Sequence, residues 1–338
     1  MTHKRKKIYR NLFVGVITSG IAIYWLLGFV QKDELIAQIS NVNLWHLGAA
    51  FALTCVSYLL RAYRWPFFFK YNQPNFFVSY RCLILGFFAN NVLPARLGEF
   101  VRAHIGGRAT KQSRSYVLAT IFGERLADGL MISLLVAVLF FTMPSSEIYE
   151  ESKALLFVVY AFALAAVLTV LMVIFRKVAF AILAMISARI SSKAVHYACE
   201  RIRRLIEGLE PILHPQTLIK ISLLSFLIWS VELCVYWCVT LAFANPLSLS
   251  ELSLFLAAVN FSSLVPAAPG GVGVIEALST IALVHIGVKK EVALSMVTFQ
   301  HLIQYIAVGI PGMLFSLRNR HSYDTSLSEE AEPQVDTA

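Results

Sequence analysis

Charged residues are scarce in this sequence. Only 14% of its 338 residues are Asp, Glu, Lys or Arg, whereas 58% are hydrophobic, and the mean hydropathy is +0.68. Soluble globular domains carry about 25% charged residues, so the composition excludes that class. It is typical of a polytopic membrane protein.

The sequence also lacks several motifs of known chemistry. It contains no G-x-x-x-x-G-K-[ST] loop, which excludes a P-loop ATPase. Its five cysteines, at positions 55, 82, 199, 234 and 238, have neither metal-ligand nor disulfide-framework spacing, so we interpret them as packing thiols. We therefore predict no cofactor and no metal site.

The basic residues are unevenly distributed. The formal net charge of +9 arises from Lys and Arg gathered at the N-terminus and in 61–81, 96–114 and 176–220, whereas 31–43 and 144–152 are neutral to acidic. This is the positive-inside asymmetry of a membrane protein, not a nucleic-acid-binding patch. It predicts a multi-pass protein of the inner (plasma) membrane with a cytoplasmic N-terminus.

Long apolar runs define the expected spans. Crossing about 30 Å of hydrocarbon takes roughly 20 residues, and runs of this order occupy 11–30, 44–60, 116–143, 153–175, 219–243, 272–288 and 291–317. Two shorter apolar stretches occupy 76–94 and 251–267. We predict that Pro94, Pro266 and Pro269, at or close to their ends, break the helices. The predicted fold class is an all-α polytopic membrane protein with about seven to eight transmembrane helices and one or two re-entrant or broken helices.

The two interrupted stretches suggest a repeated plan. "NNVLPARLGE" in the first half and "NFSSLVPAAPGGVGVIEA" in the second each run from Asn through Pro-Ala and glycine to a glutamate. Paired short, Pro/Gly-interrupted segments are typical of transporter binding sites. We predict inverted half-repeats at 44–175 and 219–317, within a transmembrane domain of 1–318; the alternative is two ordinary loops.

Three further segments complete the predicted organisation. Residues 176–218 form a basic, amphipathic cytoplasmic connection, and 319–338 form a disordered polar tail. Residues 61–81 interleave aromatics with arginines, as in an interfacial belt. The side of the membrane on which the C-terminus lies is left undecided. An inverted repeat in which 272–288 crosses the membrane puts it outside, whereas Arg318 and Arg320 favour the cytoplasm.

Ionisable residues occur within the predicted spans. Glu124, Arg125 and Asp128 lie on neighbouring parts of one helical face near mid-membrane, and Glu232 is near the centre of 219–243. In the last span, His301 is accompanied by Gln300, Gln304 and Tyr305. Charges at this depth are costly unless they pair or face water, so we expect either a polar cavity or a purely structural ion pair.

The arginines favour an anionic ligand. Arg96, Arg102 and Arg125 carry guanidinium groups, whose forked donors fit the oxygens of a phosphate. Backbone amides at Gly270, Gly271 and Gly273 can approach an anion closely. Glu99 and Glu124 could hold the arginines, accept a cationic headgroup or carry protons. An anion site in apolar surroundings favours a phosphate-headgroup lipid, with proton coupling through Glu124, Glu232 or His301.

Three motifs carry a family resemblance. "NNVLPARLGEFVRA", "FGERLADGL" and "PAAPGGVGVIEA", in this order, resemble the lysylphosphatidylglycerol synthase transmembrane region, or flippase-like family, over about residues 10–318. The resemblance implies a stand-alone relative of proteins thought to move a modified lipid between leaflets. Matched position by position, it implicates the following residues in the site: Asn91, Pro94, Arg96, Gly98, Glu99, Arg102, Glu124, Arg125, Asp128, Pro269, Gly270, Gly271, Gly273 and Glu276.

We therefore predict a lipid translocase without enzymatic activity. Its partners would be phospholipids or polyprenyl-phosphate lipids, and it would not bind nucleic acid. One alternative is a membrane enzyme acting on a lipid phosphate or polyprenyl glycolipid, with His104 or His301 as base. Another is a non-transporting partner subunit of a separate lipid-modifying enzyme.

Overall fold

All regular secondary structure is helical in the part of the chain that the structure describes. The computed structural model describes residues 21, 24, 28, 31–93, 97–142, 153–190, 192–263, 265 and 268–329, and no strand occurs among them. The predicted all-α class is thus confirmed. Most of the predicted first span, 11–30, lies outside these residues, as do Pro94, Arg96 and Pro266.

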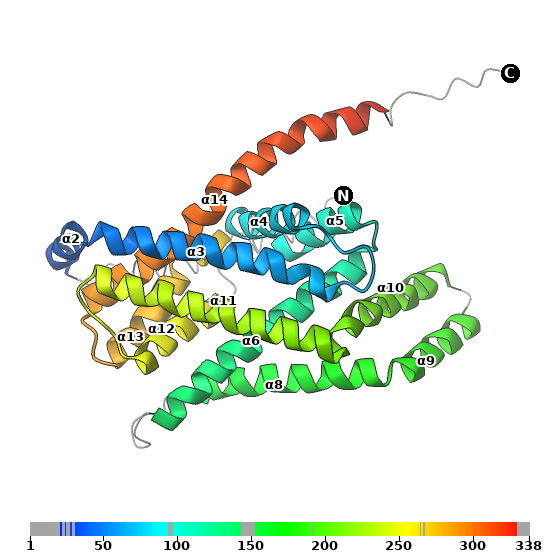
Figure 1. Ribbon diagram of the computed structural model, residues 1–338, viewed down its shortest axis with the longest axis horizontal. Helices are drawn as coiled ribbons and strands as arrows, with labels where there is room; N and C mark the ends of the chain where they lie inside the picture. The colour runs from blue at the N-terminus through cyan, green and yellow to red at the C-terminus, as the bar shows by residue number, and fades with distance from the viewer. Residues whose placement is uncertain are drawn as a thin grey trace.

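The first half of the chain contributes six elements (Figure 1). They are α2 (Lys32–Ser40), α3 (Leu44–Arg64), the 3-10 turn η1 (Trp65–Phe68), α4 (Phe76–Val92), α5 (Gly98–Thr110) and α6 (Arg114–Thr142). Asparagine side chains set two of the helix starts, because Asn43 accepts the N–H of Trp45 and Asn75 accepts that of Val78.

The remaining elements follow α6. They are α8 (Lys153–Ile174), α9 (Arg176–Arg189), α10 (Lys193–Leu209), η3 (Glu210–Leu213), α11 (Pro215–Ala242), α12 (Leu249–Ser262), η4 (Pro269–Gly271), α13 (Val274–His285) and α14 (Lys290–Glu329). The described segments Leu44–Phe68, Pro215–Ala242 and Lys290–Leu317 are long and apolar enough to cross a membrane, and the bent pair Tyr160–Ile174 and Arg176–Arg189 would make a fourth.

Helices α3 and α11 form the antiparallel centre of the bundle (Figure 1). The N–H of Asn43, at the start of α3, donates to the carbonyl of Ala242 at the end of α11, at 2.9 Å. At the other end of the pair, Arg64 donates to Ser225 at 2.6 Å. The two helices therefore cross the same thickness in opposite directions.

Two helical hairpins fill the space beside this pair. Helix α4 packs on α5, and α12 packs on α13. The first hairpin is tight, since a Cβ at Gly98 would lie 1.9 Å from the carbonyl oxygen of Gly86. The predicted span 272–288 is wrong, because the helix there, α13, has 12 residues and rises only about 18 Å. It forms the second arm of a hairpin.

The packing order of the two halves corresponds. In the first half α3 contacts α4, α4 contacts α5 and α5 contacts α6; in the second half α11, α12, α13 and α14 follow the same order. Across the halves, α4 packs on α14 and α12 packs on α6. The half-repeat boundaries stay a prediction, but each hairpin meets the last long helix of the other half.

The connection between the halves is helical. Helix α9 turns 71° away from α8, and α10 returns to pack on α6 with Ile206 and Leu209 buried. Glu210 accepts hydrogen bonds from Lys70 at 3.1 Å, and this hydrogen bond raises the pKa of Lys70. The connection is thus fixed to the end of α3 and η1.

The interfacial belt predicted for 61–81 is wrong at its beginning. Arg61 is 6% exposed, and Arg64 and Trp65 are fully buried. The reason is long-range packing: α3 packs on α11, and carboxylates of α6 and α11 accept its two arginines. Tyr71, at 61% exposed, remains consistent with a belt.

Candidate functional site

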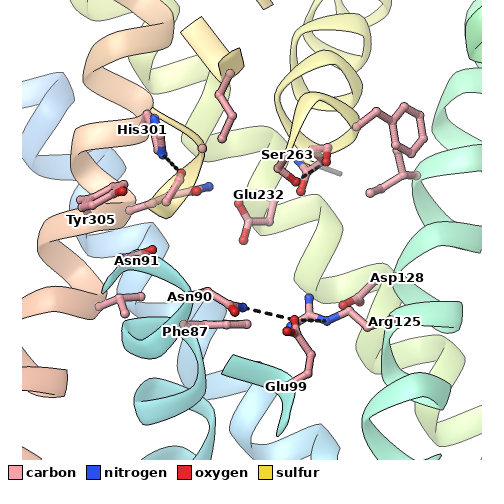
Figure 2. Close-up of a pocket in the computed structure, with 18 of the residues that line it drawn as sticks. Phe87, Asn90, Asn91, Glu99, Arg125, Asp128, Glu232, Ser263, His301 and Tyr305 are labelled. Carbon is pink, nitrogen blue, oxygen red and sulfur yellow. Dashed lines mark hydrogen bonds and ion pairs between the residues drawn. The ribbon is translucent and has the colours of Figure 1, made fainter. Parts of the chain in front are cut away.

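A cavity of about 890 Å³ lies between the two hairpins. Its walls come from α3, α6, α11 and α14 and from the facing ends of α4, α5, α12 and η4 (Figure 2). Cavities of this size in proteins hold ligands larger than a simple ion. The cavity is therefore the candidate site.

One wall rests on ion pairs between α3 and α6. Arg61 contacts Asp128 at 2.8 Å, and Arg64 contacts the other oxygen of Asp128 at 2.9 Å and Glu124 at 3.8 Å. The arginines are three residues apart and the carboxylates four, so each pair shares a helix face. The two arginines of α3 therefore alternate with the two carboxylates of α6.

Two more charges extend this series. Arg102, on α5, reaches Glu124 at 2.7 Å and lies over the ring of Trp65, 4.2 Å from its centroid. At the other end, Arg61 contacts Glu232 at 3.3 Å, and Ser57 donates to Glu232 at 2.6 Å.

We call these six residues the charge chain. In order they are Arg102, Glu124, Arg64, Asp128, Arg61 and Glu232. Three cations alternate with three carboxylates, so the chain is neutral overall, as burial of charge requires. Its members come from α3, α5, α6 and α11, and it fixes these helices together.

A second, looser ion pair faces the cavity directly. The Nε of Arg125 lies 4.0 Å from Glu99, beyond hydrogen-bonding distance, and has no hydrogen-bond partner among the residues described. The Arg125 guanidinium lies 5.1 Å from the ring centroid of Phe87, and its side chain is 38% exposed. Asn90 donates to Glu99 at 3.2 Å. Arg125 can therefore accept an anionic ligand (Figure 2).

Hydrogen bonds to α14 hold the glycine turn of the second hairpin. His301 Nδ1 lies 2.6 Å from Glu276, and its Nε2 lies 3.1 Å from the carbonyl oxygen of Gly270. Glu276 also accepts the N–H of Gly273 at 2.6 Å. Gly270 has φ of +73°, and a Cβ there would overlap the hydroxyl of Tyr305. Glycine is thus required at this turn.

The structure brings part of the predicted set together. Among the predicted residues, those that line the cavity are Asn91, Glu99, Arg125, Asp128, Glu232, Gly270, Gly271 and His301. The following lie behind its walls: Arg102, Glu124, Gly273 and Glu276. Pro269 begins η4 at its edge, and Arg96, Pro94 and Pro266 lie outside the described residues.

Sequence reasoning missed Arg61 and Arg64. Arg61 lines the cavity, and Arg64 supports it from behind. Their spacing at the end of a 21-residue apolar helix was a signal, since it complements the spacing of Glu124 and Asp128. The neighbouring aromatics instead favoured an interfacial position.

The residues that the structure describes include no candidate metal site. No group of three or more His, Cys, Asp or Glu side chains there could hold a metal ion. The site instead offers guanidinium groups, carboxylates, amides and aromatic faces, which bind by charge and hydrogen bonding.

Comparisons with known proteins agree with a membrane family. A UPF0104 membrane protein from Pyrococcus horikoshii is 23% identical over 335 residues, covering 93% of this chain and 98% of the relative. One from Methanothermobacter thermautotrophicus is 22% identical, covering 68% of this chain and 72% of the relative. Glycosyltransferase AglD from Haloferax volcanii is 22% identical, covering 97% of this chain and 58% of that protein.

No solved structure matches this sequence. Residues 12–312 match the family described as the lysylphosphatidylglycerol synthase TM region. This match covers most of the sequence and includes both hairpins and every described residue of the cavity. The chain therefore belongs to the lysylphosphatidylglycerol synthase transmembrane region family.

Proposed function

We propose that this chain moves a phosphate-headgroup lipid between the leaflets of the inner membrane. The observation that carries the proposal is the cavity between the two hairpins, with Arg125 on its wall. A lipid headgroup needs a polar route through hydrocarbon, while its acyl chains need none. A cavity lined by both charged and apolar side chains supports such a route.

The arginines take different roles in this proposal. Arg125 binds the lipid phosphate, because its nearest carboxylate is 4.0 Å away and its side chain is partly open to the cavity. Arg102 is almost fully buried and already paired with Glu124, so we assign both residues to the scaffold. Arg96 stays a predicted second phosphate contact.

The arrangement of hairpins supports alternating access. Each hairpin packs against the last long helix of the opposite half, so movement of one half against the other would open the cavity to either leaflet. The inverted half-repeats are part of this proposal. Exchange would be downhill or coupled to protons at Glu232 or His301, which both line the cavity.

Reconstitution tests the proposal. Purified protein in liposomes with an acyl-labelled, fluorescent phospholipid should make the inner-leaflet label accessible to an outside quencher. Arg125→Gln should slow this exchange about tenfold or more, the loss of one charge-assisted contact. Arg203→Gln is the matched control, since Arg203 pairs with Glu207 on α10, away from the cavity. Equal rates for wild type and Arg125→Gln would contradict the proposal.

The similarity to glycosyltransferase AglD favours a second candidate, the membrane portion of an enzyme system acting on a lipid-linked glycan. This chain covers 58% of that protein, so the whole protein's activity is only a proposal here. Mass spectrometry of the liposome lipids decides between the two. A changed lipid mass without leaflet exchange would favour the enzyme, and exchange only after a partner is added would favour a partner subunit.

A further inference from the structure

The turn of the second hairpin contacts the first hairpin. Helices α12 and α13 pack on each other, and the turn η4 between them packs on α4. Gly270, Gly271 and Gly273 all have positive φ, so the path of this turn depends on glycine. The turn also lines the cavity. A change in its position would therefore change both the cavity and the contact between the two hairpins.

Glu276 and His301 hold this turn at its two ends. The Nε2 of His301 lies 3.1 Å from the carbonyl oxygen of Gly270, and its Nδ1 lies 2.6 Å from one carboxylate oxygen of Glu276. The other oxygen of Glu276 accepts the N–H of Gly273 at 2.6 Å. Figure 2 shows His301 beside the cavity. The two side chains thus connect α13 and α14 through the turn.

These contacts require a proton between Glu276 and His301. A carbonyl oxygen only accepts, so Nε2 must carry a hydrogen to bind Gly270. A neutral imidazole has a single N–H, so Nδ1 would then present a lone pair to the carboxylate. A proton between Nδ1 and the carboxylate oxygen removes this conflict, whichever of the two atoms carries it. The pair then has no net charge, as burial favours.

Loss of this proton breaks one of the two contacts of His301. The neutral ring donates either to Glu276 or to Gly270, and its other nitrogen then presents a lone pair to an oxygen. The pair also gains a net negative charge, which is unfavourable where the His301 side chain is only 8% exposed. The proton leaves to water in the cavity, which His301 lines. One end of the turn is therefore released whichever nitrogen keeps its hydrogen.

The other titratable groups around His301 do not hold the turn through this proton. Tyr305 packs edge-on against the ring, with centroids 4.9 Å apart, and a tyrosine keeps its proton up to about pH 10. The remaining titratable or charged residues that line the cavity come from α3, α5, α6 and α11: Tyr58, Arg61, Glu99, Arg125, Asp128 and Glu232. Each charged member of this set lies within 4.0 Å of an opposite charge. The described parts of α4 and α12 add no titratable side chain to the lining.

We propose that Glu276 and His301 form a proton-binding site that fixes the turn of the second hairpin to α14. With the proton bound the turn is held, and without it the turn moves relative to α4. This inference deepens the proposed function, on which it rests for the role of the turn in lipid exchange, because it names the ion and the element that the ion holds. Proton binding itself needs no lipid.

Hydrogen–deuterium exchange of the detergent-solubilised full chain tests the proton site. The protection of residues 268–274 is measured by mass spectrometry from mildly acidic to mildly alkaline pH and corrected for the intrinsic pH dependence of amide exchange. We expect protection to fall about tenfold or more as the pH rises, since the turn loses a charge-assisted hydrogen bond. Constant protection across this range would overturn the inference.

Glu276→Gln separates the proton from the shape of the site. A glutamine carbonyl can accept the Gly273 N–H while its amide donates to Nδ1 of a neutral His301, so both contacts form without the extra proton. Protection should then be high at every pH, whereas His301→Ala should give low protection at every pH. His196→Gln, which changes an exposed histidine on α10, is the matched control and should keep the wild-type pH dependence. Low protection at every pH in Glu276→Gln would overturn the inference.

Lipid exchange keeps the two proposals distinguishable. In the liposome assay with equal pH on both sides, wild-type exchange should rise about tenfold or more with pH as the turn loses its charge-assisted contact. Glu276→Gln should remove this dependence. Exchange that depends on pH equally in both proteins would overturn the proton site. A turn that responds to pH in a protein that exchanges no lipid would overturn only the translocase proposal.

Discussion

Arg64 is the residue on which the charge chain depends most. It is fully buried and lies between Asp128 and Glu124, so water cannot solvate these two carboxylates if the guanidinium is removed. Arg64→Met should lower the free energy of unfolding by about 3–5 kcal/mol, because it leaves two buried carboxylates with one cation fewer. Unfolding of the detergent-solubilised protein, followed by circular dichroism, measures this.

Arg203→Met provides the comparison for Arg64. Arg203 is more than half exposed in its pair with Glu207, and exposed pairs contribute about 0–1 kcal/mol. If both variants lost the same small amount, the charge chain would not be structural.

Residue types alone could not assign these roles. Arg102 and Arg125 both lie close to a glutamate in the sequence, Arg102 three residues after Glu99 and Arg125 directly after Glu124. Arg102 is paired with Glu124 behind the cavity wall, whereas Arg125 faces the cavity. The difference comes from the way in which α5 and α6 pack against each other. Partners 67 and 171 residues away likewise hid the burial of Arg61.

At the scale of elements, the close approach of α4 and α5 depends on Gly98. A Cβ there would lie 1.9 Å from the Gly86 carbonyl oxygen and 2.5 Å from Asn90 Oδ1, which accepts the Gly98 N–H at 2.7 Å. Gly98→Ala should therefore separate the hairpin arms, displace Glu99 and reduce lipid exchange about tenfold or more, since small misplacements in a site cost this much. The exchange assay measures it.

Gly309→Ala controls for the general effect of adding a methyl group. Gly309 lies in α14 with nothing within 4 Å of the added Cβ, so exchange should stay at the wild-type rate. Normal exchange by Gly98→Ala would mean that the hairpin tolerates separation.

The sequence predicted the hairpins only in part. Pro/Gly interruption correctly marked 76–94 and 251–267 as short, and α4 and α12 lie there. It did not reveal that 272–288 also fails to span, because hydropathy measures apolar character and not where a helix folds back. The break at Gly287, which has φ of +90°, and the packing of α13 on both α12 and α14 decide that.

For the whole molecule, α14 runs from one end of the bundle to the other. Gln31 donates to Glu291 at 3.0 Å, so the start of α14 lies at the same end of the bundle as α2. Phe315 packs against Tyr80, with ring centroids 6.1 Å apart, so the far part of α14 lies beside the start of α4. Helix α14 therefore runs from the end of the bundle near α2 toward the end that carries the basic loops.

Cysteine labelling checks this topology. In a background without the five native cysteines, Asn41→Cys should react with an impermeant reagent from outside intact cells. Asn72→Cys and Ser326→Cys should react only after permeabilisation, because the positive-inside rule puts the basic end in the cytoplasm. External labelling at Ser326→Cys together with cytoplasmic Asn72→Cys would contradict the arrangement of α14.

Composition and charge distribution were sufficient for the fold class, because the hydrophobic fraction and the long apolar runs depend on no tertiary contact. The side of the C-terminus was not predictable, because it depends on whether one apolar segment crosses or turns back. That choice is made by contacts such as Gln31 with Glu291, which join distant parts of the sequence.

The charge chain also has a consequence for biogenesis. Helices enter the bilayer in order of synthesis, and Arg61 precedes Asp128 by 67 residues and Glu232 by 171. Arginines in a newly inserted α3 therefore lack these carboxylates until α6 is made, and Arg61 lacks its last one until α11 is inserted. A nascent chain that stops short of α11 would hold an uncompensated cation in the bilayer. The ion pairs of the first half are therefore complete only after α11 of the second half is inserted.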